Sequence, residues 1–334
     1  MIGYYVHHQG RGHASRAASI AAATEQEVVV LSSLPRPATW TGGWVLLDRD
    51  DGGAAPTAVD AGGRLHWVPL HDAGLAARMA AVSAWIVANR PSLLVVDVSV
   101  EIAVLARLHG VPVVTFALPG DRGDAPHGLG FDMADTVLAC WPDGAGGVVG
   151  GLSASSEAKL RPIGAISRFH RSASDPAPVP RTVLVLSGAG GSGPDAALLT
   201  AARASTPDWT WTVLDGTPEG WVDDPWPLIC AADVVITHAG QNALADVAAA
   251  GRPAIVVPQD RPHDEQLWAA RALERDGDYP VLVLDTFPAS GWEALLERAA
   301  TLDGGAWRRW NDGAGAVRAA RVLDERAASF EVAR

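Results

Sequence analysis

Short apolar runs alternate with alanine-rich stretches of helical length along almost the whole chain. The runs at residues 2–6 and 93–96 are apolar at consecutive positions, without the polar alternation of a half-exposed strand. Strands of this kind are buried on both faces, as in a parallel sheet that helices cover on both sides. The pattern therefore predicts an α/β fold of the doubly wound, Rossmann-like type.

The expected strands fall into two series. The first comprises residues 2–6, 27–31, 93–97, 111–116 and 136–139, and the second comprises 183–187, 210–214, 234–237, 254–257 and 281–284. Between them lies the proline-rich segment SASDPAPVPR, which has no hydrophobic period and reads as a linker. We therefore expect a first Rossmann-like domain over 1–170, a linker over 171–181, a second Rossmann-like domain over 182–312 and a C-terminal helix over 313–334. One possibility for this helix is that it crosses back and packs on the first domain.

Composition narrows the class of protein. The 334 residues suit two domains, and a net charge of −12 without a basic cluster argues against nucleic acid as a partner. The two cysteines, Cys140 and Cys230, are far apart and form no CxxC motif, which argues against a disulfide framework or a zinc site. No apolar run approaches the length of a membrane-spanning helix. These features predict a cytoplasmic protein and leave peripheral membrane contact open.

The expected strand at 234–237 is followed by a turn of small residues that opens a helix. This turn holds His238, Gly240, Gln241 and Asn242. Backbone N–H groups and the positive dipole end at such a helix start suit a phosphate group. Asp246, about two turns into the helix, is placed to accept hydrogen bonds from ribose hydroxyls.

The stretch THAGQNALADVAAAGRPAIVVPQDRPHDEQLWAARAL, residues 237–273, resembles the donor-binding region of nucleotide-sugar glycosyltransferases of the GT-B architecture. The nearest family is that of the N-acetylglucosaminyltransferase that forms lipid II, with the natural-product glycosyltransferases close behind. These enzymes have two facing Rossmann-like domains and carry HGGxNS, an acidic residue, GxP and a final D/E-Q pair. The resemblance implies that His238, Gly240 and Gln241 contact a diphosphate, with Asn242 in the same donor site. It further implies that Asp246, where a glutamate is usual, contacts ribose and that Glu265 and Gln266 read the donor sugar.

Further donor-side residues match the same resemblance. Trp221 and Val222 stand where an aromatic-aliphatic pair holds a uracil edge, and Arg168 of GAISR stands where an arginine binds the diphosphate. The loop SGAGGSG, with Gly190, Gly191 and Ser192, lacks the P-loop lysine and is expected to let the backbone approach the phosphates or the acceptor.

The stretch GRGHASRA follows the first expected strand and resembles the turn that begins the acceptor domain in this superfamily. The resemblance suggests His13 as the general base for the acceptor hydroxyl, since imidazole suits that task near neutral pH. Asp97, at the end of an expected strand, would orient His13, as in the His–Asp dyads of natural-product and plant relatives. Arg11, Gly12 and His127 are the candidates on the acceptor side.

These features predict an inverting glycosyltransferase that uses a nucleotide-diphospho-sugar, UDP-linked by resemblance, and an acceptor hydroxyl that the sequence does not identify. No cofactor and no metal are expected, because helix N-termini and Arg168 can neutralise the diphosphate. Two alternatives stay open. One is a nucleotide-sugar hydrolase of the same fold, whose relatives share the GxGHxxR start that GRGHASR matches, with His13 activating water. The other is a non-catalytic nucleotide-sugar-binding partner subunit.

Overall fold

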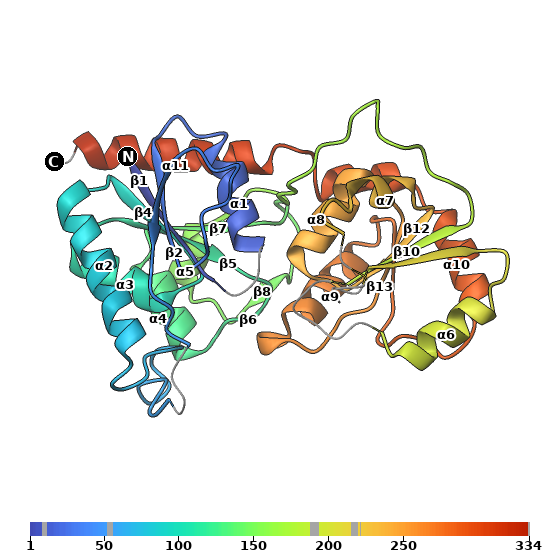
Figure 1. Cartoon of the computed structure of the whole chain (residues 1–334), viewed down its shortest axis with the longest axis horizontal. Coiled ribbons are helices and arrows are strands. Elements are labelled where there is room, and N and C mark those ends of the chain that lie inside the picture. Colours follow the sequence, from blue (N-terminus) through green and yellow to red (C-terminus); the bar gives the residue numbers. More distant parts are fainter. Residues whose placement is uncertain (9–11, 52–55, 188–193, 215–219, 221, 333–334) are drawn as a thin grey trace.

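The computed structural model describes residues 1–8, 12–51, 56–187, 194–214, 220 and 222–332. Figure 1 shows two α/β lobes side by side, each built on a twisted parallel sheet. The first sheet has the order β3-β2-β1-β4-β5-β7-β9 and the second has the order β11-β10-β12-β13-β14. A short pair, β6 (Gly120–Asp121) and β8 (Val149–Gly150), lies apart from both.

The strands of the two sheets pair in parallel throughout the described residues. Those of the first sheet are β1 (Ile2–Val6), β2 (Val28–Ser32), β3 (Gly43–Leu46), β4 (Leu93–Asp97), β5 (Val113–Ala117), β7 (Thr136–Ala139) and β9 (Leu160–Pro162). Those of the second are β10 (Thr182–Leu186), β11 (Thr210–Leu214), β12 (Val234–Thr237), β13 (Ala254–Val256) and β14 (Val281–Val283). The edge strands β3 and β9 were not predicted. Both are only partly buried, and β9 has no apolar run.

Helices connect the strands and cover the sheets. In the first lobe these are α1 (Gly12–Ala21), α2 (Ala73–Asn89), α3 (Val100–Leu108), α4 (Ala125–Met133) and α5 (Ala154–Lys159). In the second they are α6 (Ala196–Ala204), α7 (Trp226–Ala231), α8 (Gln241–Ala250), α9 (Glu265–Asp276) and α10 (Trp292–Ala300), with the 3₁₀ helices η1 (Pro262–Asp264) and η2 (Gly304–Arg309). The last helix, α11 (Gly315–Val332), ends the chain.

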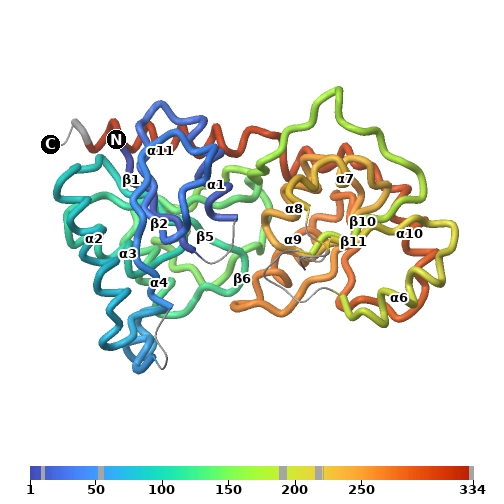
Figure 2. The backbone as a smooth tube through the Cα atoms, viewed as in Figure 1, coloured from blue at the N-terminus to red at the C-terminus, as the bar shows by residue number. Residues whose placement is uncertain are grey.

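Helix α11 follows the second lobe in sequence but packs on the first. Figures 1 and 2 show it running back along the first lobe. Its residues Ala319 and Leu323 are buried in the same apolar cluster as Ile2 of β1 and Ile20 of α1. The two lobes are therefore joined by two chain crossings, the segment before β10 and the start of α11.

The order of each sheet reverses beside its first strand, since β1 lies between β2 and β4 and β10 lies between β11 and β12. In doubly wound sheets, ligands bind outside the carboxyl ends of the strands at such a reversal. These two points hold the ends of β1 and β4, the start of α1 and the turn from β12 into α8. The topology thus assembles a site from both lobes.

Candidate functional site

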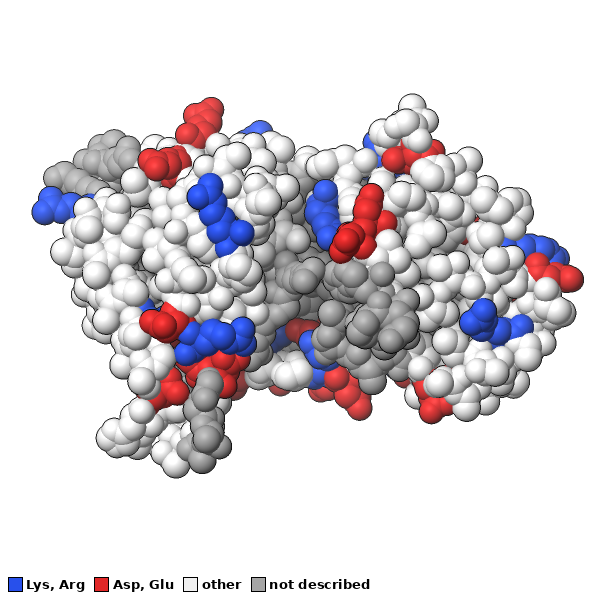
Figure 3. Space-filling model, viewed as in Figure 1, with Lys and Arg blue, Asp and Glu red and all other residues white. Residues whose placement is uncertain are grey.

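A cleft of about 450 Å³ lies between the lobes and is lined by residues of both. The first lobe contributes Gly12, His13 and Arg16 of α1, and the second contributes the β12–α8 turn and the start of α9. On the face seen in Figure 3, basic and acidic side chains are interspersed and do not form one basic patch.

His13 and Asp97 are in direct contact. His13 Nδ1 lies 2.9 Å from Asp97 Oδ1, and the His13 side chain is 19% exposed while that of Asp97 is fully buried. Asp97 is the last residue of β4, which pairs with β1, so the sheet places the carboxylate beside the start of α1. Arg16 Nη2 also lies 3.1 Å from His13 Nδ1, but the shorter contact is to the ionised carboxylate, which only accepts hydrogen bonds. We therefore assign the proton to Nδ1, which leaves the Nε2 lone pair to accept another hydrogen bond. This is the arrangement that a general base requires.

Arg16, one helical turn after His13, binds the same carboxylate. Its Nε lies 3.0 Å from Asp97 Oδ2 and its Nη2 lies 2.5 Å from Oδ1, a bidentate pair in the interior. The guanidinium also stacks on the ring of Phe116 at 4.4 Å. Burial opposes the negative charge of Asp97, but the charges of Arg16 and His13 outweigh it and hold the pKa of Asp97 well below its usual range. Asp97 is therefore ionised at every pH at which the protein would be assayed.

The turn between β12 and α8 fixes the orientation of His238. The Gly240 N–H donates to His238 Nδ1 at 2.9 Å, so the neutral imidazole carries its proton on Nε2. Burial, and then the charge of Arg261, lower the pKa of His238 to about 4, which keeps the ring neutral near pH 7. A Cβ on Gly240 would collide with the His238 ring, so this turn requires glycine. His238 thus lines the cleft as an uncharged hydrogen-bond donor.

Gln241, the first residue of α8, connects the two lobes. Its Oε1 lies 3.4 Å from Arg16 Nη1, a contact between residues 225 positions apart. Its Nε2 is buried and has no hydrogen-bond partner within the described structure. Beside it, Asn242 lies so close to α1 that a Cβ on Gly12 would collide with its side chain. An unsatisfied buried N–H at a helix start is a donor that a bound anion would satisfy.

Asp246 is buried at the far end of the same cleft. Ser167 Oγ donates to its Oδ1 at 2.7 Å, and Arg168 Nε lies 3.9 Å from its Oδ2. Burial raises the pKa of Asp246 to about 6, although the Ser167 hydroxyl and the Arg168 charge act in the opposite direction. The carboxylate and Arg168 both line the cleft, where they offer an acceptor and a cation to a ligand.

Glu265 and Gln266 begin α9 and also line the cleft. Gln266 is buried, and its Oε1 accepts from the Gln259 N–H at 2.9 Å. Glu265 lies 3.7 Å from both Arg122 of the first lobe and Arg261 of the second. The two residues therefore stand at the seam between the lobes.

The remaining sequence candidates divide into three groups. Gly12 and Val222 line the cleft. Arg11, Gly190, Gly191, Ser192 and Trp221 lie outside the described residues. His127 is absent from the described lining of the cleft and instead contacts Asp124 and Arg122 at the rim.

Sequence reasoning missed three charged residues that line the cleft, Arg16, Asp223 and Arg261. The spacing of three between His13 and Arg16 was a usable signal, because residues three apart share one face of a helix. Arg261 precedes the 3₁₀ helix η1 and had no comparable pattern, because its place depends on how η1 and α9 dock.

Comparison with known proteins first defines the class by fold. The structure matches the glycotransferase of kitacinnamycin with 17% identity and a TM-score of 0.65, over 97% of this chain and 98% of that one. It matches MurG of Acinetobacter baumannii with 16% identity and a TM-score of 0.59, over 98% and 99%. For spinosyn forosaminyltransferase the identity is 15% and the TM-score 0.68, over 98% and 99%. The chain thus has the GT-B fold of nucleotide-sugar glycosyltransferases, as predicted.

The more particular assignment comes from the second lobe. Residues 222–291 match the model of the glycosyltransferase family 28 C-terminal domain, which confirms the resemblance drawn from residues 237–273. A curated relative, the UDP-N-acetylglucosamine--N-acetylmuramyl-(pentapeptide) pyrophosphoryl-undecaprenol N-acetylglucosamine transferase of Yersinia pestis (strain Pestoides F), is 36% identical over 76 residues. That match covers 23% of this chain and 21% of the relative, so it spans about a fifth of the relative's length.

Proposed function

We propose that the protein is an inverting glycosyltransferase that moves a sugar from a nucleotide-diphospho-sugar to an acceptor hydroxyl. The observation that carries this proposal is the His13–Asp97 pair, 2.9 Å apart, in a cleft shared with the N-terminus of α8. One lobe thus presents a base and the other presents donors for a diphosphate. The family 28 C-terminal domain in the second lobe supports the same division.

In the proposed reaction the acceptor hydroxyl loses its proton to His13 Nε2 as its oxygen attacks the anomeric carbon. Asp97 holds the Nδ1 proton and favours the imidazolium that forms. The bond from the anomeric carbon to the diphosphate oxygen breaks with its electron pair, so negative charge grows on the leaving group. The N-terminus of α8, with His238 and Gln241, and the arginines of the cleft would stabilise that charge.

The nucleotide is proposed to lie along α8. The unsatisfied Gln241 Nε2 and the protonated His238 Nε2 supply neutral donors, and Arg168 supplies a cation. The Asp246 carboxylate would accept from the ribose hydroxyls. The name of the curated relative includes a UDP-sugar, and Val222 lines the cleft at the position proposed for a uracil edge, so we propose UDP as the nucleotide.

The deciding experiment measures UDP release from UDP-sugars with and without a panel of hydroxyl acceptors. We expect release only with an acceptor, and a product of inverted anomeric configuration by NMR. Rapid release in buffer alone would instead establish a nucleotide-sugar hydrolase, the activity that the GxGHxxR start also matches. Tight UDP-sugar binding without turnover on any acceptor would identify a binding subunit.

A further inference from the structure

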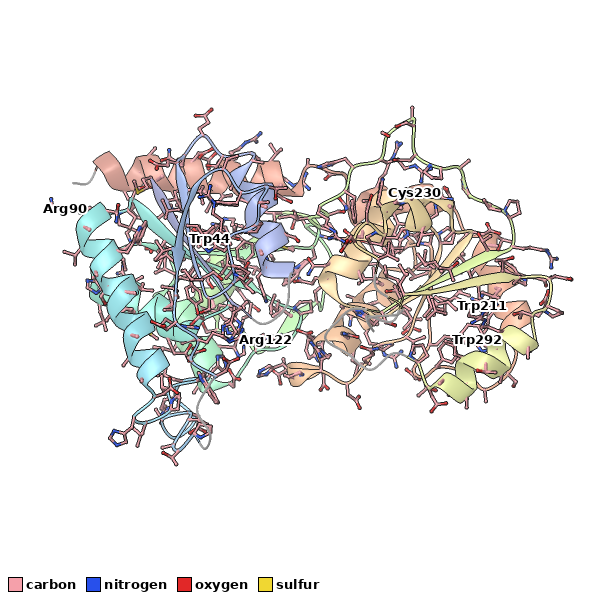
Figure 4. The ribbon with its side chains drawn as sticks, viewed as in Figure 1. Trp44, Arg90, Arg122, Trp211, Cys230 and Trp292 are labelled. Carbon is pink, nitrogen blue, oxygen red and sulfur yellow. The ribbon has the colours of Figure 1, made fainter. Side chains whose placement is uncertain are left out.

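A group of three histidines and one aspartate lies at the seam between the lobes and has no role in the proposed reaction. His66 lies in the loop before α2, Asp124 is the N-cap of α4, His127 follows it by three residues, and His263 lies in η1 of the second lobe. One ligand-type atom of each lies within 4.8 Å of those of the other three. Figure 4 labels the neighbouring Arg122 on the flank of the first lobe that faces the second.

We propose that His66, Asp124 and His263 form a binding site for a zinc-like divalent transition-metal ion that joins the two lobes. Asp124 Oδ2 lies 3.8 Å from His66 Nε2 and 3.7 Å from His263 Nδ1. Both distances are too long for hydrogen bonds. They suit two ligands of one ion, because metal–ligand bonds of roughly 2.0–2.2 Å at wide angles separate ligand atoms by about 3.3–3.8 Å. Two imidazoles and a carboxylate are a donor set that Zn²⁺ accepts, with a fourth position left to solvent.

The carboxylate of Asp124 is already oriented for this task. Its Oδ1 accepts from the His127 backbone N–H at 2.9 Å and from His127 Nδ1 at 2.6 Å, which turns Oδ2 toward the other two histidines. On the opposite side of its ring, His127 Nε2 accepts from Arg122 Nη1 at 3.2 Å. Arg122 itself donates to the Pro119 carbonyl, which anchors its guanidinium on the Nε2 side of the His127 ring. His127 thus acts as a positioning residue that fixes the ligand carboxylate.

An ion at this site would connect a strained backbone segment of the second lobe to the first lobe. His263 and Asp264 both adopt left-handed backbone angles, with φ of 60° and 53°, which non-glycine residues adopt at a cost. The backbone here passes so close to β6 that a Cβ on Gly120 would collide with the His263 carbonyl. Because His263 lies two residues before Glu265, an ion at this site would hold the start of α9 against the first lobe.

A second group of potential ligands in the described residues, His8, Asp50 and Asp51, differs in one decisive respect. Arg78 lies 2.9 Å from Asp50 and Arg49 lies 2.5 Å from Asp51, so arginines already neutralise both carboxylates. No arginine or lysine pairs with Asp124 among the described ion pairs, where its partners are histidines. Of these two groups, the one around Asp124 at the seam is therefore the one where a bound cation would be favoured.

The test uses full-length, untagged, chelator-treated protein and needs no measurement of turnover. We expect one equivalent of Zn²⁺ to bind in calorimetry and to raise Tm, and Co²⁺ to give the visible absorption of a low-symmetry site with nitrogen and oxygen ligands. His66→Gln and His263→Gln should each weaken binding by at least about tenfold, and His127→Asn by about 10–100-fold. His170→Gln, at an exposed histidine elsewhere, and His8→Gln should both bind as the wild type does.

Circular dichroism and Tm of the metal-free variants establish that each is folded, which the exposed position of His66 and the partly exposed position of His263 should permit. The proposal is overturned if the wild type shows no saturable binding at micromolar Zn²⁺. It is equally overturned if binding persists in both His66→Gln and His263→Gln, or if only His8→Gln abolishes it. The outcome is independent of whether the protein transfers a sugar, so the two proposals stand or fall separately.

Discussion

Asp97 accepts hydrogen bonds from both His13 and Arg16, so one carboxylate orients the proposed base and neutralises a buried guanidinium. These tasks compete, because the charge shared with Arg16 is less available to stabilise a protonated His13. Orientation of the His13 ring is therefore the larger part of what we expect Asp97 to supply. The proposed roles of His13 and Asp97 are therefore tested by different measurements.

Replacing His13 tests the base. His13→Ala should lower kcat by about 10²–10⁴-fold, because general base catalysis contributes on that scale. UDP affinity in calorimetry should hardly change, since the proposed nucleotide contacts lie on the second lobe. His109→Ala, at an exposed histidine that ends α3, is the control and should keep full turnover. Full turnover in His13→Ala would mean that the imidazole only shapes the turn.

Replacing Asp97 tests the buried ion pair through stability. Asp97→Asn leaves the Arg16 guanidinium buried without a counter-charge, and we expect the free energy of unfolding in urea to fall by about 3–5 kcal/mol. The double variant Arg16→Met/Asp97→Asn removes that charge and should recover part of the loss. If Asp97→Asn is as stable as the wild type, Arg16 and Asp97 are not paired as described.

Asp246 gives the clearest dependence on pH. Its pKa of about 6 lies above the unfolded value of 3.8, so the folded state holds the proton more tightly. Stability from this group is therefore complete below about pH 4 and lost as pH rises through 6, by about 3 kcal/mol at 1.36 kcal/mol per unit. Asp246→Asn should be more stable than the wild type at pH 8 and should approach it near pH 4.

The same variant should bind UDP more weakly at pH 8, since an amide is a poorer acceptor for ribose hydroxyls than a carboxylate. Asp208→Asn, at an exposed aspartate, is the matched control for both measurements and should follow the wild type. A stability difference that does not change with pH would show that Asp246 is not a buried titrating group.

Among the elements, the start of α8 has the most specific geometry. No side chain caps the helix, and the residues of its first turn line the cleft. Its N-cap, Gly240, donates its N–H to His238. The sequence pattern predicted this element because the turn and the helix are contiguous in the chain. What it did not predict is that Gln241 would reach Arg16 on the other lobe.

Gly240→Ala tests this element. The added Cβ collides with the His238 ring, so the imidazole must move and the donor at Nε2 is displaced. We expect UDP binding to weaken by about 1–2 kcal/mol in calorimetry, the loss of a hydrogen bond to a charged group. Gly128→Ala in α4 meets no atom within 4 Å and should leave UDP binding unchanged. Unaltered affinity in a folded Gly240→Ala protein would remove His238 from the nucleotide site.

For the whole molecule, the decisive feature is that two lobes share one cleft. The cleft is lined by Arg16 of the first lobe, by Arg168 and Arg261, and by the start of α8. Because Arg16 is already paired with Asp97, it is Arg168, Arg261 and the start of α8 that supply positive charge where the diphosphate is proposed to lie. Helix α11 and the segment before β10 both join the lobes. Among the described residues, no helix is long and apolar enough to span a membrane.

This distribution of charge predicts that turnover persists in excess EDTA, measured as UDP release with the accepted acceptor. The metal site proposed at the seam lies outside the cleft lining, so chelation should lower Tm without abolishing the reaction. Complete loss of activity that Mg²⁺ or Mn²⁺ restores would show that the arginines and the helix start do not suffice for the diphosphate.

The sequence by itself determined the class of fold and the contiguous parts of the site. Continuous apolar runs predict buried parallel strands, and the turn after residue 237 predicts an anion-binding helix start, because both signals depend only on near neighbours in the chain. The pairing of His13 with Asp97 could be proposed, through resemblance, although 84 positions separate them. The identities of His13 and Asp97 alone do not determine the distance between their side chains.

Only the tertiary structure decided the contacts between segments that have no local relation. Arg16 meets Asp97 because β1 pairs with β4, and it meets Gln241 because the two lobes close on each other. The expectation of no metal rested on the two distant cysteines and on the helix N-termini and Arg168 that can neutralise a diphosphate. In contrast, His66, Asp124 and His263 are brought together by a loop, a helix start and a strained turn on two lobes. Such contacts depend on sheet order and on the docking of the lobes, which are set by packing over the whole chain and leave no pattern at any one place in the sequence.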